Sequence, residues 1–206
     1  MLLLGDVCIA ETDRIFFDKN LEKIFKSNLS ICNLEGPINT KRVFNNETYK
    51  MYNASHSIEF LKRTNTKVVN LSNNHIFDWG DEAVLDTINY LNKKGINNIG
   101  YRLRKNVQMS PVFLNEGIHN YSFYSFGWPI ISCKRPTKTR PGINPLDEYD
   151  IDYYIKNIIP NIPKNYIKVV YMHWCYEMEP YVQPLHRDFA RKLIDNGVQV
   201  VTGSHP

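Results

Sequence analysis

Short apolar runs alternate with segments of helical spacing in the first half of the chain, and this alternation constrains the fold more than any other feature. The sequence predicts strands and helices in turn, at 1–7, 18–26, 29–34, 55–62, 67–71, 81–94 and 96–99. The helix over 81–94 carries Val84 and Leu91 on one stripe and ends at Gly95, while Asp18 and Ser55 are candidate N-caps of the two earlier helices. Such alternation predicts an α/β fold with a largely parallel central sheet.

The pattern changes after residue 110. Two apolar-aromatic strands, 112–114 and 121–126, follow each other closely enough to form an antiparallel pair, and the proline-rich, basic stretch 127–150 predicts a long loop. The remaining predicted elements are a weak helix, a buried strand, a helix and a last strand, at 151–158, 167–172, 185–195 and 198–202.

Composition excludes several classes of protein. With 206 residues and 43% hydrophobic content, we expect a single domain over 1–206 with its own core and no intrinsic disorder. The formal net charge of +4 is mild and its lysines and arginines are scattered, which argues against nucleic-acid binding but permits an anionic substrate.

The sequence also bears on location. Its apolar runs are far shorter than the ~20 residues of a membrane-spanning helix, and no basic region followed by an apolar stretch opens the chain. Its four cysteines form no CxxC pair. We therefore expect a reduced, cytoplasmic chain without a signal peptide or an intrinsic membrane segment.

Potential metal ligands directly follow the predicted strands. They are Asp6, Glu35, Asn74 beside His75, His173 and His205. Because the carboxyl ends of parallel strands lie along one edge of a sheet, these groups can converge although they span the chain. Taken singly, each is more often a turn residue or a hydrogen-bonded histidine. Together, at equivalent positions, they favour a site.

The chemistry of this set is coherent. Two carboxylates, an amide oxygen and imidazoles, without thiolate, suit Mn, Fe or Zn better than a structural cysteine-zinc site. Two divalent ions ~3.5–4 Å apart can clamp a phosphate and activate a bound water. The sequence therefore predicts divalent metal ions as the cofactor.

Several segments, in this order, resemble one family. They are Gly5-Asp6-Val7, Asn33-Leu34-Glu35-Gly36-Pro37, Leu71-Ser72-Asn73-Asn74-His75 with Asp78, Gly80 and Thr87, Gly95-Ile96 to Gly100, His173-Trp174 with Glu177, and Ala190 to Gly203 leading into His205-Pro206. The chain resembles the bacterial capsule-synthesis proteins of the CapA and PgsA type, associated with poly-γ-glutamate capsules. That family looks like a branch of the calcineurin-like metallophosphatase superfamily.

The resemblance implies a β-sandwich flanked by helices in α/β/β/α layers, with a mixed first sheet and the antiparallel pair in the second. It also implies roles for the site residues. Two ions would be held by Asp6, Glu35, Asn74, His173 and His205, with Glu35 bridging them. His75 would donate a proton to the leaving group, and Asp78 would orient it.

The sequence departs from the family pattern at three places. Cys8 stands where metallophosphatases commonly have histidine, either as a ligand or as an unpaired structural thiol, and Cys175 stands where the family usually has glycine. The family's last motif continues His-Pro-His, whereas this sequence stops at His205-Pro206. This departure predicts a fragment lacking its C-terminal strands, or the loss of part of one metal site.

Three further residues are candidate substrate contacts. Glu177 matches the family and would support a ligand or the substrate, and Trp174 would shield the site or stack on a sugar, although core packing is the usual role of tryptophan. Arg135 lies in the basic stretch 134–140, which would receive a polyanion, although most such stretches are only solvated loops.

Three functions remain open from the sequence. The first is a metal-dependent phosphoesterase-like hydrolase that serves capsule or exopolysaccharide production and acts on a phosphoester or an anionic polymer. The second is a non-catalytic, polymer-binding or scaffold component of a capsule synthesis or export complex, working with other capsule-synthesis proteins. The third is a degraded gene product that does not fold.

Overall fold

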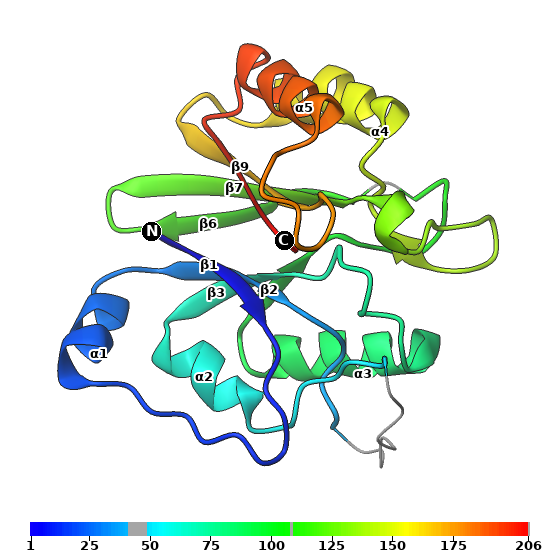
Figure 1. Ribbon diagram of the computed structural model, residues 1–206. Helices are drawn as coiled ribbons and strands as arrows, with labels where there is room; N and C mark the ends of the chain where they lie inside the picture. The colour runs from blue at the N-terminus through cyan, green and yellow to red at the C-terminus, as the bar shows by residue number, and fades with distance from the viewer. Residues whose placement is uncertain (41–48, 108, 206) are drawn as a thin grey trace. The chain divides into compact units, whose positions relative to one another are not determined.

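The computed structural model describes residues 1–40, 49–107 and 109–205. The chain forms two compact units, Met1–Asn98 and Ile99–Pro206 (Figure 1). Pro206, in the last predicted motif, lies outside the described residues. Among the described residues, no helix combines the length and the apolar character needed to cross a bilayer.

The first unit is a four-stranded sheet with helices between its strands. Its elements are β1 (Leu2–Val7), α1 (Lys19–Lys26), β2 (Ser30–Leu34), α2 (Ser57–Arg63), β3 (Thr66–Asn70), α3 (Gly80–Lys93) and β4 (Asn97–Ile99). The sheet order is β1-β2-β3-β4, and the pairs β1–β2 and β2–β3 are parallel. These two pairs follow the strand–helix alternation, because a helical crossover returns the chain in the same direction. The mixed first sheet that the resemblance implies stays a prediction.

Local sequence explains the ends of the helices in this unit. Asp18 caps α1, as predicted, and its carboxylate accepts hydrogen bonds from the backbone N–H groups of Asn20 and Leu21, both at 2.8 Å. The predicted cap of α2 is wrong by one residue, since His56 and not Ser55 occupies the N-cap position, without a side-chain cap bond. The chain therefore enters α2 without the hydroxyl cap that the sequence offered.

The second unit contains a mixed sheet and a two-stranded sheet. Its strands are β5 (Tyr101–Arg102), β6 (Val112–Glu116), β7 (His119–Gly127), β8 (Gly142–Ile143), β9 (Tyr166–His173) and β10 (Val200–Ser204). The larger sheet has the order β10-β9-β7-β6, and β5 pairs with β8. The predicted antiparallel pair is confirmed as β6–β7, while β7–β9 and β9–β10 are parallel.

Helices α4 (Glu148–Tyr153) and α5 (Pro184–Asp195) cover one face of this sheet (Figure 1). A π-helical turn, Tyr154–Ile158, continues α4, and 3₁₀ turns lie at Pro129–Ile131 and Ile159–Asn161. Their side chains close one core with β7 and β9, formed by Tyr124, Phe126, Leu146, Ile151, Tyr154, Val170, Met172, Phe189 and Leu193 among others.

The predicted loop over 127–150 is only partly a loop. It contains a 3₁₀ turn, strand β8 and the start of α4. Helix α4 begins at Glu148, earlier than predicted, because the Asp147 carboxylate accepts a hydrogen bond from the backbone N–H of Asp150 at 3.0 Å. Both units are thus α/β structures. The stacking of two sheets into a sandwich and the single domain over 1–206 stay predictions.

Candidate metal centre

Three polar residues lie side by side across the parallel strands of the first unit. Asp6 on β1 is in register with Asn33 on β2, and Asn33 is in register with Asn70 on β3. Because neighbouring strands are parallel and in register, these side chains leave the sheet at one level. The Nδ2 group of Asn33 donates to Oδ1 of Asp6 at 2.6 Å. The same group donates to Oε2 of Glu35, two residues further along the chain.

Asn33 is a buried amide that joins two carboxylates. Its Oδ1 accepts hydrogen bonds from the Nδ2 groups of Asn70, at 2.9 Å, and Asn73, at 3.1 Å. The amide orientation is fixed, because turning the group over would bring its NH₂ against two other NH₂ groups. Asn33 is not among the site residues predicted from the sequence. Its signal was an amide inside an otherwise apolar buried strand.

Asn73 holds the loop after β3 against the end of β2. Its Nδ2 donates to the Leu34 carbonyl at 2.8 Å, and its Oδ1 accepts from the backbone N–H of His75 at 3.2 Å. Asn73 is fully buried, whereas Asn74 is half-buried. Of the two adjacent asparagines, Asn73 therefore shapes the loop, and Asn74 is the one on its accessible side.

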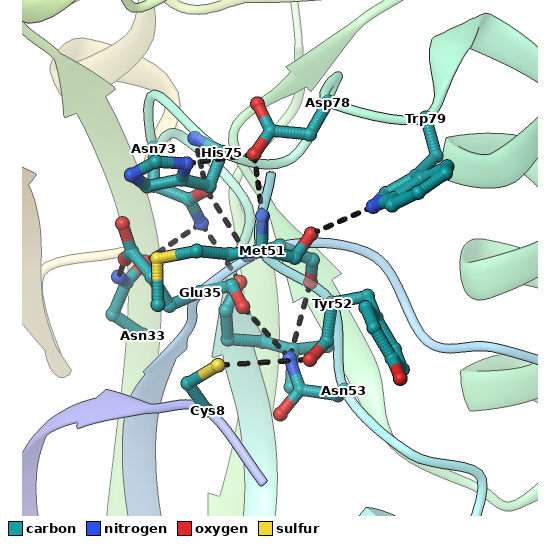
Figure 2. A network of polar contacts seen from close by, with 12 residues as sticks. Cys8, Asn33, Glu35, Met51, Tyr52, Asn53, Asn73, His75, Asp78 and Trp79 are labelled. Atoms are coloured by element: carbon teal, nitrogen blue, oxygen red, sulfur yellow. Dashed lines mark hydrogen bonds and ion pairs between the residues drawn. The ribbon is translucent and has the colours of Figure 1, made fainter. Parts of the chain in front are cut away.

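His75 and Asp78 face each other within this loop (Figure 2). The Nδ1 atom of His75 lies 2.8 Å from Oδ2 of Asp78, and the same carboxylate oxygen accepts from the backbone N–H of Met51 at 2.7 Å. Both side chains are largely buried, with exposed fractions of 21% and 16%. The ring is thus oriented through Nδ1, which leaves Nε2 as the atom suited to exchange a proton with a ligand.

Glu35 is held by its backbone as well as its carboxylate. Its N–H donates to Val7 O at 2.9 Å, and its carbonyl accepts from Nδ2 of Asn53 at 2.8 Å. The next residue, Gly36, has φ +81°, and a Cβ atom there would lie 2.7 Å from Met51 O. Only glycine fits this crossing of two backbone segments.

Cys8 occupies the edge of this cluster. Its Sγ donates to Tyr52 O at 3.6 Å (Figure 2). Burial, with smaller contributions from the charges of Glu35 and Asp13, raises the pKa of the thiol. A thiol with a raised pKa is mostly protonated near neutral pH and is a poor metal ligand in that form. These contacts favour the structural interpretation of Cys8.

The two predicted histidine ligands meet in the second unit. His173 ends β9, and His205 directly follows β10, whose Ser204 is in register with His173. The ring centroids are 4.7 Å apart, and one ring nitrogen of each lies within 4.8 Å of the other. The Ser204 hydroxyl lies 3.2 Å from Nδ1 of His173. Two ligands on one tetrahedral zinc lie ~3.4 Å apart, so a small side-chain movement would let both imidazoles share an ion.

His205 adopts an unusual backbone conformation. Its φ is +108°, in a region that residues with a Cβ rarely adopt. Such strain costs of order 1–3 kcal/mol and occurs often at functional sites. Cys175 and Met178, in the loop after His173, also have positive φ values. Both segments that follow the histidine-bearing strands are therefore strained.

The Trp174 side chain is half-buried and packs against other side chains of its own unit. A Cβ atom at Gly203 would lie 2.4 Å from its Nε1, so the glycine makes room for the indole. Trp174 stacks on the fully buried His186, with ring centroids 5.3 Å apart, and His186 lies edge-on to Trp128 at 4.4 Å. The indole supports the strand end that carries His173. Glu177 is exposed on the loop that follows.

Arg135 lies against an acid of its own unit. It forms an ion pair with Asp147, the residue that caps α4, while 54% of its side chain is exposed. Both residues line a cavity of about 460 Å³, together with Arg102 and Tyr149. The structure thus gives Arg135 a defined place in a mixed-charge cavity and not on an isolated basic loop.

The donor chemistry of both units fits divalent ions. The first unit offers the carboxylates of Asp6 and Glu35 and the amide of Asn74, and the second offers two adjacent imidazoles, His173 and His205. Mixed oxygen and nitrogen donors of this kind suit Mn, Fe or Zn. The prediction that all five ligands serve one centre stays a prediction, as do the roles of His75 and Asp78.

Comparisons with known proteins identify the family. A family model described as bacterial capsule synthesis protein PGA_cap matches residues 9–206. The chain is 24% identical over 199 residues to the PGA biosynthesis protein CapA of Bacillus subtilis (strain 168), covering 94% of the chain and 51% of that protein. It is 25% identical over 158 residues to the capsule biosynthesis protein CapA of Bacillus anthracis, covering 73% of the chain and 37% of that protein.

The chain therefore spans about half the length of the first of these relatives and less of the second. The family match, in contrast, extends over nearly all of the chain and includes every predicted site residue except Asp6. On this match, the chain belongs to the bacterial capsule synthesis protein family PGA_cap.

Proposed function

We propose that this chain carries a metal-dependent phosphoesterase-like hydrolase site that serves the production of a capsule or exopolysaccharide. The proposal includes the metallophosphatase-type sandwich as the scaffold. The observation that carries it is the arrangement in the first unit, where one amide bridges Asp6 and Glu35 while Asp78 holds His75 by Nδ1. Two adjacent carboxylates repel each other unless cations neutralise them, and an imidazole held in one orientation suits proton transfer.

The metal ligands in this proposal are Asp6, Glu35, Asn74, His173 and His205, with Glu35 shared between two ions. When bound, the ions would supply charge neutralisation for a phosphate group and activation of water. The protein residues hold the geometry. Asn33 keeps the two carboxylates together, and Ser204 contacts His173. Outer contacts of this type orient ligands and tune their affinity.

His75 would protonate the leaving oxygen. The carboxylate of Asp78 only accepts hydrogen bonds, and it already accepts one from Met51 N, so Nδ1 of His75 carries a proton. Protonation of Nε2 then gives an imidazolium that is stabilised by Asp78 and can transfer its Nε2 proton. Asp78, itself held by Met51 N, contacts the ring at Nδ1, so Nε2 would be the nitrogen that serves the leaving oxygen.

Metal analysis followed by a phosphodiester assay tests this function. The purified chain should bind two divalent ions and hydrolyse bis(p-nitrophenyl) phosphate, and His75→Ala should lower kcat by about 10²–10⁴-fold without loss of metal. His119→Ala, which removes an exposed histidine of β7, is the matched control. Two bound ions with no hydrolysis, or hydrolysis unchanged in His75→Ala, would refute the catalytic assignment.

A specific observation also favours the alternative, a non-catalytic polymer-binding component. The 460 Å³ cavity of the second unit contains three cations, Arg102, Lys105 and Arg135, and two acids, Asp147 and Asp150, beside the exposed ring of Tyr149. Arg102 is buried in its pair with Asp150, so Lys105 and the half-exposed Arg135 are the cations that an anionic polymer would meet. Binding of polyglutamate that weakens in Arg135→Ala, in a chain holding one ion or none, would support this function over the first.

A further inference from the structure

A cavity of about 400 Å³ opens beside Asp6 in the first unit. Its walls come from the end of β1, the following loop and helix α2, and they include Asp6, Asp13, Arg14, Phe16, Phe17 and Phe60. This volume is in the range of ~300–1,000 Å³ typical of sites for small organic ligands. A candidate metal carboxylate thus forms part of the wall of a cavity that is otherwise largely apolar and includes three phenylalanines.

The loop that forms this wall is held at several points. Oδ2 of Asp13 accepts from Ala10 N at 2.8 Å, which closes a turn. The Asp13 carbonyl lies 3.1 Å from Nε2 of His56, and Arg63 donates to Ile15 O at 3.1 Å. Because α2 and its N-cap residue His56 thereby hold the loop at two points, the cavity is preorganised and little ordering would be needed on binding.

Two adjacent phenylalanines of the loop differ in how much of the side chain is packed. Phe17 is anchored: it stacks on Phe60 with centroids 5.6 Å apart, and the Arg63 guanidinium lies 4.6 Å from its centroid. Phe16 lines the same cavity but is 82% exposed. An exposed aromatic ring beside a cavity, on a loop that is fixed by hydrogen bonds, offers a face on which a ligand ring can pack.

The charged residues around the cavity indicate which polar groups a ligand would carry. Arg14 provides a guanidinium, which suits phosphate or carboxylate oxygens. Asp13 has one carboxylate oxygen engaged by Ala10 N, and Asp6 shares one of its own with Asn33. Arg14 can therefore contact an anionic group of a ligand, and Phe16 can contact a ring with an apolar face. An anionic group beside Asp6 would in addition need the metal ions of the proposed site, since two carboxylates line this end of the cavity.

We propose that this cavity is the subsite for the organic group of the phosphoester, and that this group carries a sugar or aryl ring that packs on Phe16. The inference rests on the proposed function, because it places the phosphoryl group at the Asp6 end of the cavity. It adds the loop 9–18 as the segment that selects the substrate.

Binding measurements in the presence of Mn²⁺ test the subsite without relying on turnover. Titrations with methyl phosphate, phenyl phosphate and a hexose 1-phosphate should show tighter binding of at least one ring-bearing ligand. Phe16→Ala should weaken binding of that ligand by about 3- to 10-fold and leave methyl phosphate unchanged. Arg14→Ala should weaken all three. Comparing the phenyl and hexose compounds identifies which ring the cavity prefers.

Ile118→Ala is the control, since it removes an equally exposed apolar side chain from the β6–β7 hairpin. If methyl phosphate binds but neither ring adds affinity, or if Phe16→Ala weakens all three ligands equally, the subsite is wrong while the phosphoester site stands. If none of the ligands binds and no metal is retained, the proposed function itself has failed, and the subsite with it.

Discussion

Replacing Asn33 by leucine tests the arrangement at the centre of the candidate site. The two side chains are similar in size, and Asn33 is fully buried, so the change removes four hydrogen bonds without opening a large cavity. Asp6 is exposed and water can replace its lost donor, but the buried Glu35 carboxylate also loses a donor. The buried Asn70 and Asn73 amide groups lose their common acceptor, Oδ1 of Asn33. At roughly 1–3 kcal/mol for each unsatisfied buried group, with partial relaxation, we expect a destabilisation of about 3–5 kcal/mol.

The same substitution should respond to metal. Without Asn33, the carboxylates of Asp6 and Glu35 repel each other unless cations neutralise them, so added Mn²⁺ or Zn²⁺ should restore part of the lost stability. Metal affinity should nevertheless fall by about 10- to 100-fold, because the carboxylates are no longer oriented. The Co²⁺-substituted variant should also have an altered visible absorption spectrum.

Urea denaturation with chelator and with metal, together with metal titration against a fluorescent chelator, measures both effects. Asn144→Leu is the matched control: Asn144 is also a buried amide, and it donates to Ser125 O at 3.1 Å in the second unit. It should lose stability but keep metal affinity and the Co²⁺ spectrum. The reasoning is refuted if the free energy of unfolding of Asn33→Leu lies within about 1 kcal/mol of that of the original chain and its metal affinity is unchanged.

Three other predictions concern stability. Gly36→Ala should destabilise by about 2–4 kcal/mol in urea denaturation, because it combines positive φ with a backbone clash. Burial lowers the pKa of His186 below its ordinary 6.5, so as the pH falls the unfolded chain binds a proton at a higher pH than the folded chain does. The free energy of unfolding should therefore fall as the pH drops below about 6.5, by at most ~1.4 kcal/mol per pH unit. His186→Phe should reduce this slope. Arg102→Met should cost about 3–5 kcal/mol, because burial already raises the pKa of Asp150 and the variant removes its partner at 2.6 Å.

Each of these has a control in the same chain. Gly95→Ala, at a similar positive φ but with open space around it, should cost less than Gly36→Ala, and equal losses would contradict the clash. A pH slope unchanged in His186→Phe would assign it to other groups. Arg135→Met breaks a more exposed pair and should cost under about 1 kcal/mol. A loss as large as that of Arg102→Met would contradict the argument from burial.

The sequence by itself determined most of the longer helices and strands and their order, but not the short strands β5 and β8. The α3 stripe, the Asp18 cap and the β6–β7 pair could be read from it because helical spacing, capping and hairpin connections depend on residues close together in the chain. It also placed potential ligands at the ends of the strands, since strand boundaries are marked by local changes from apolar to polar residues.

Only the tertiary structure decided which polar groups touch. Asn33 reaches Asp6 and Asn73 across separations of 27 and 40 residues, and Asn53 reaches back to the Glu35 carbonyl. Such contacts depend on strand register and on the crossing of loops, which local spacing does not encode. For the same reason the sequence singled out His75 and Asp78 but not Met51, whose backbone N–H helps to hold them in place.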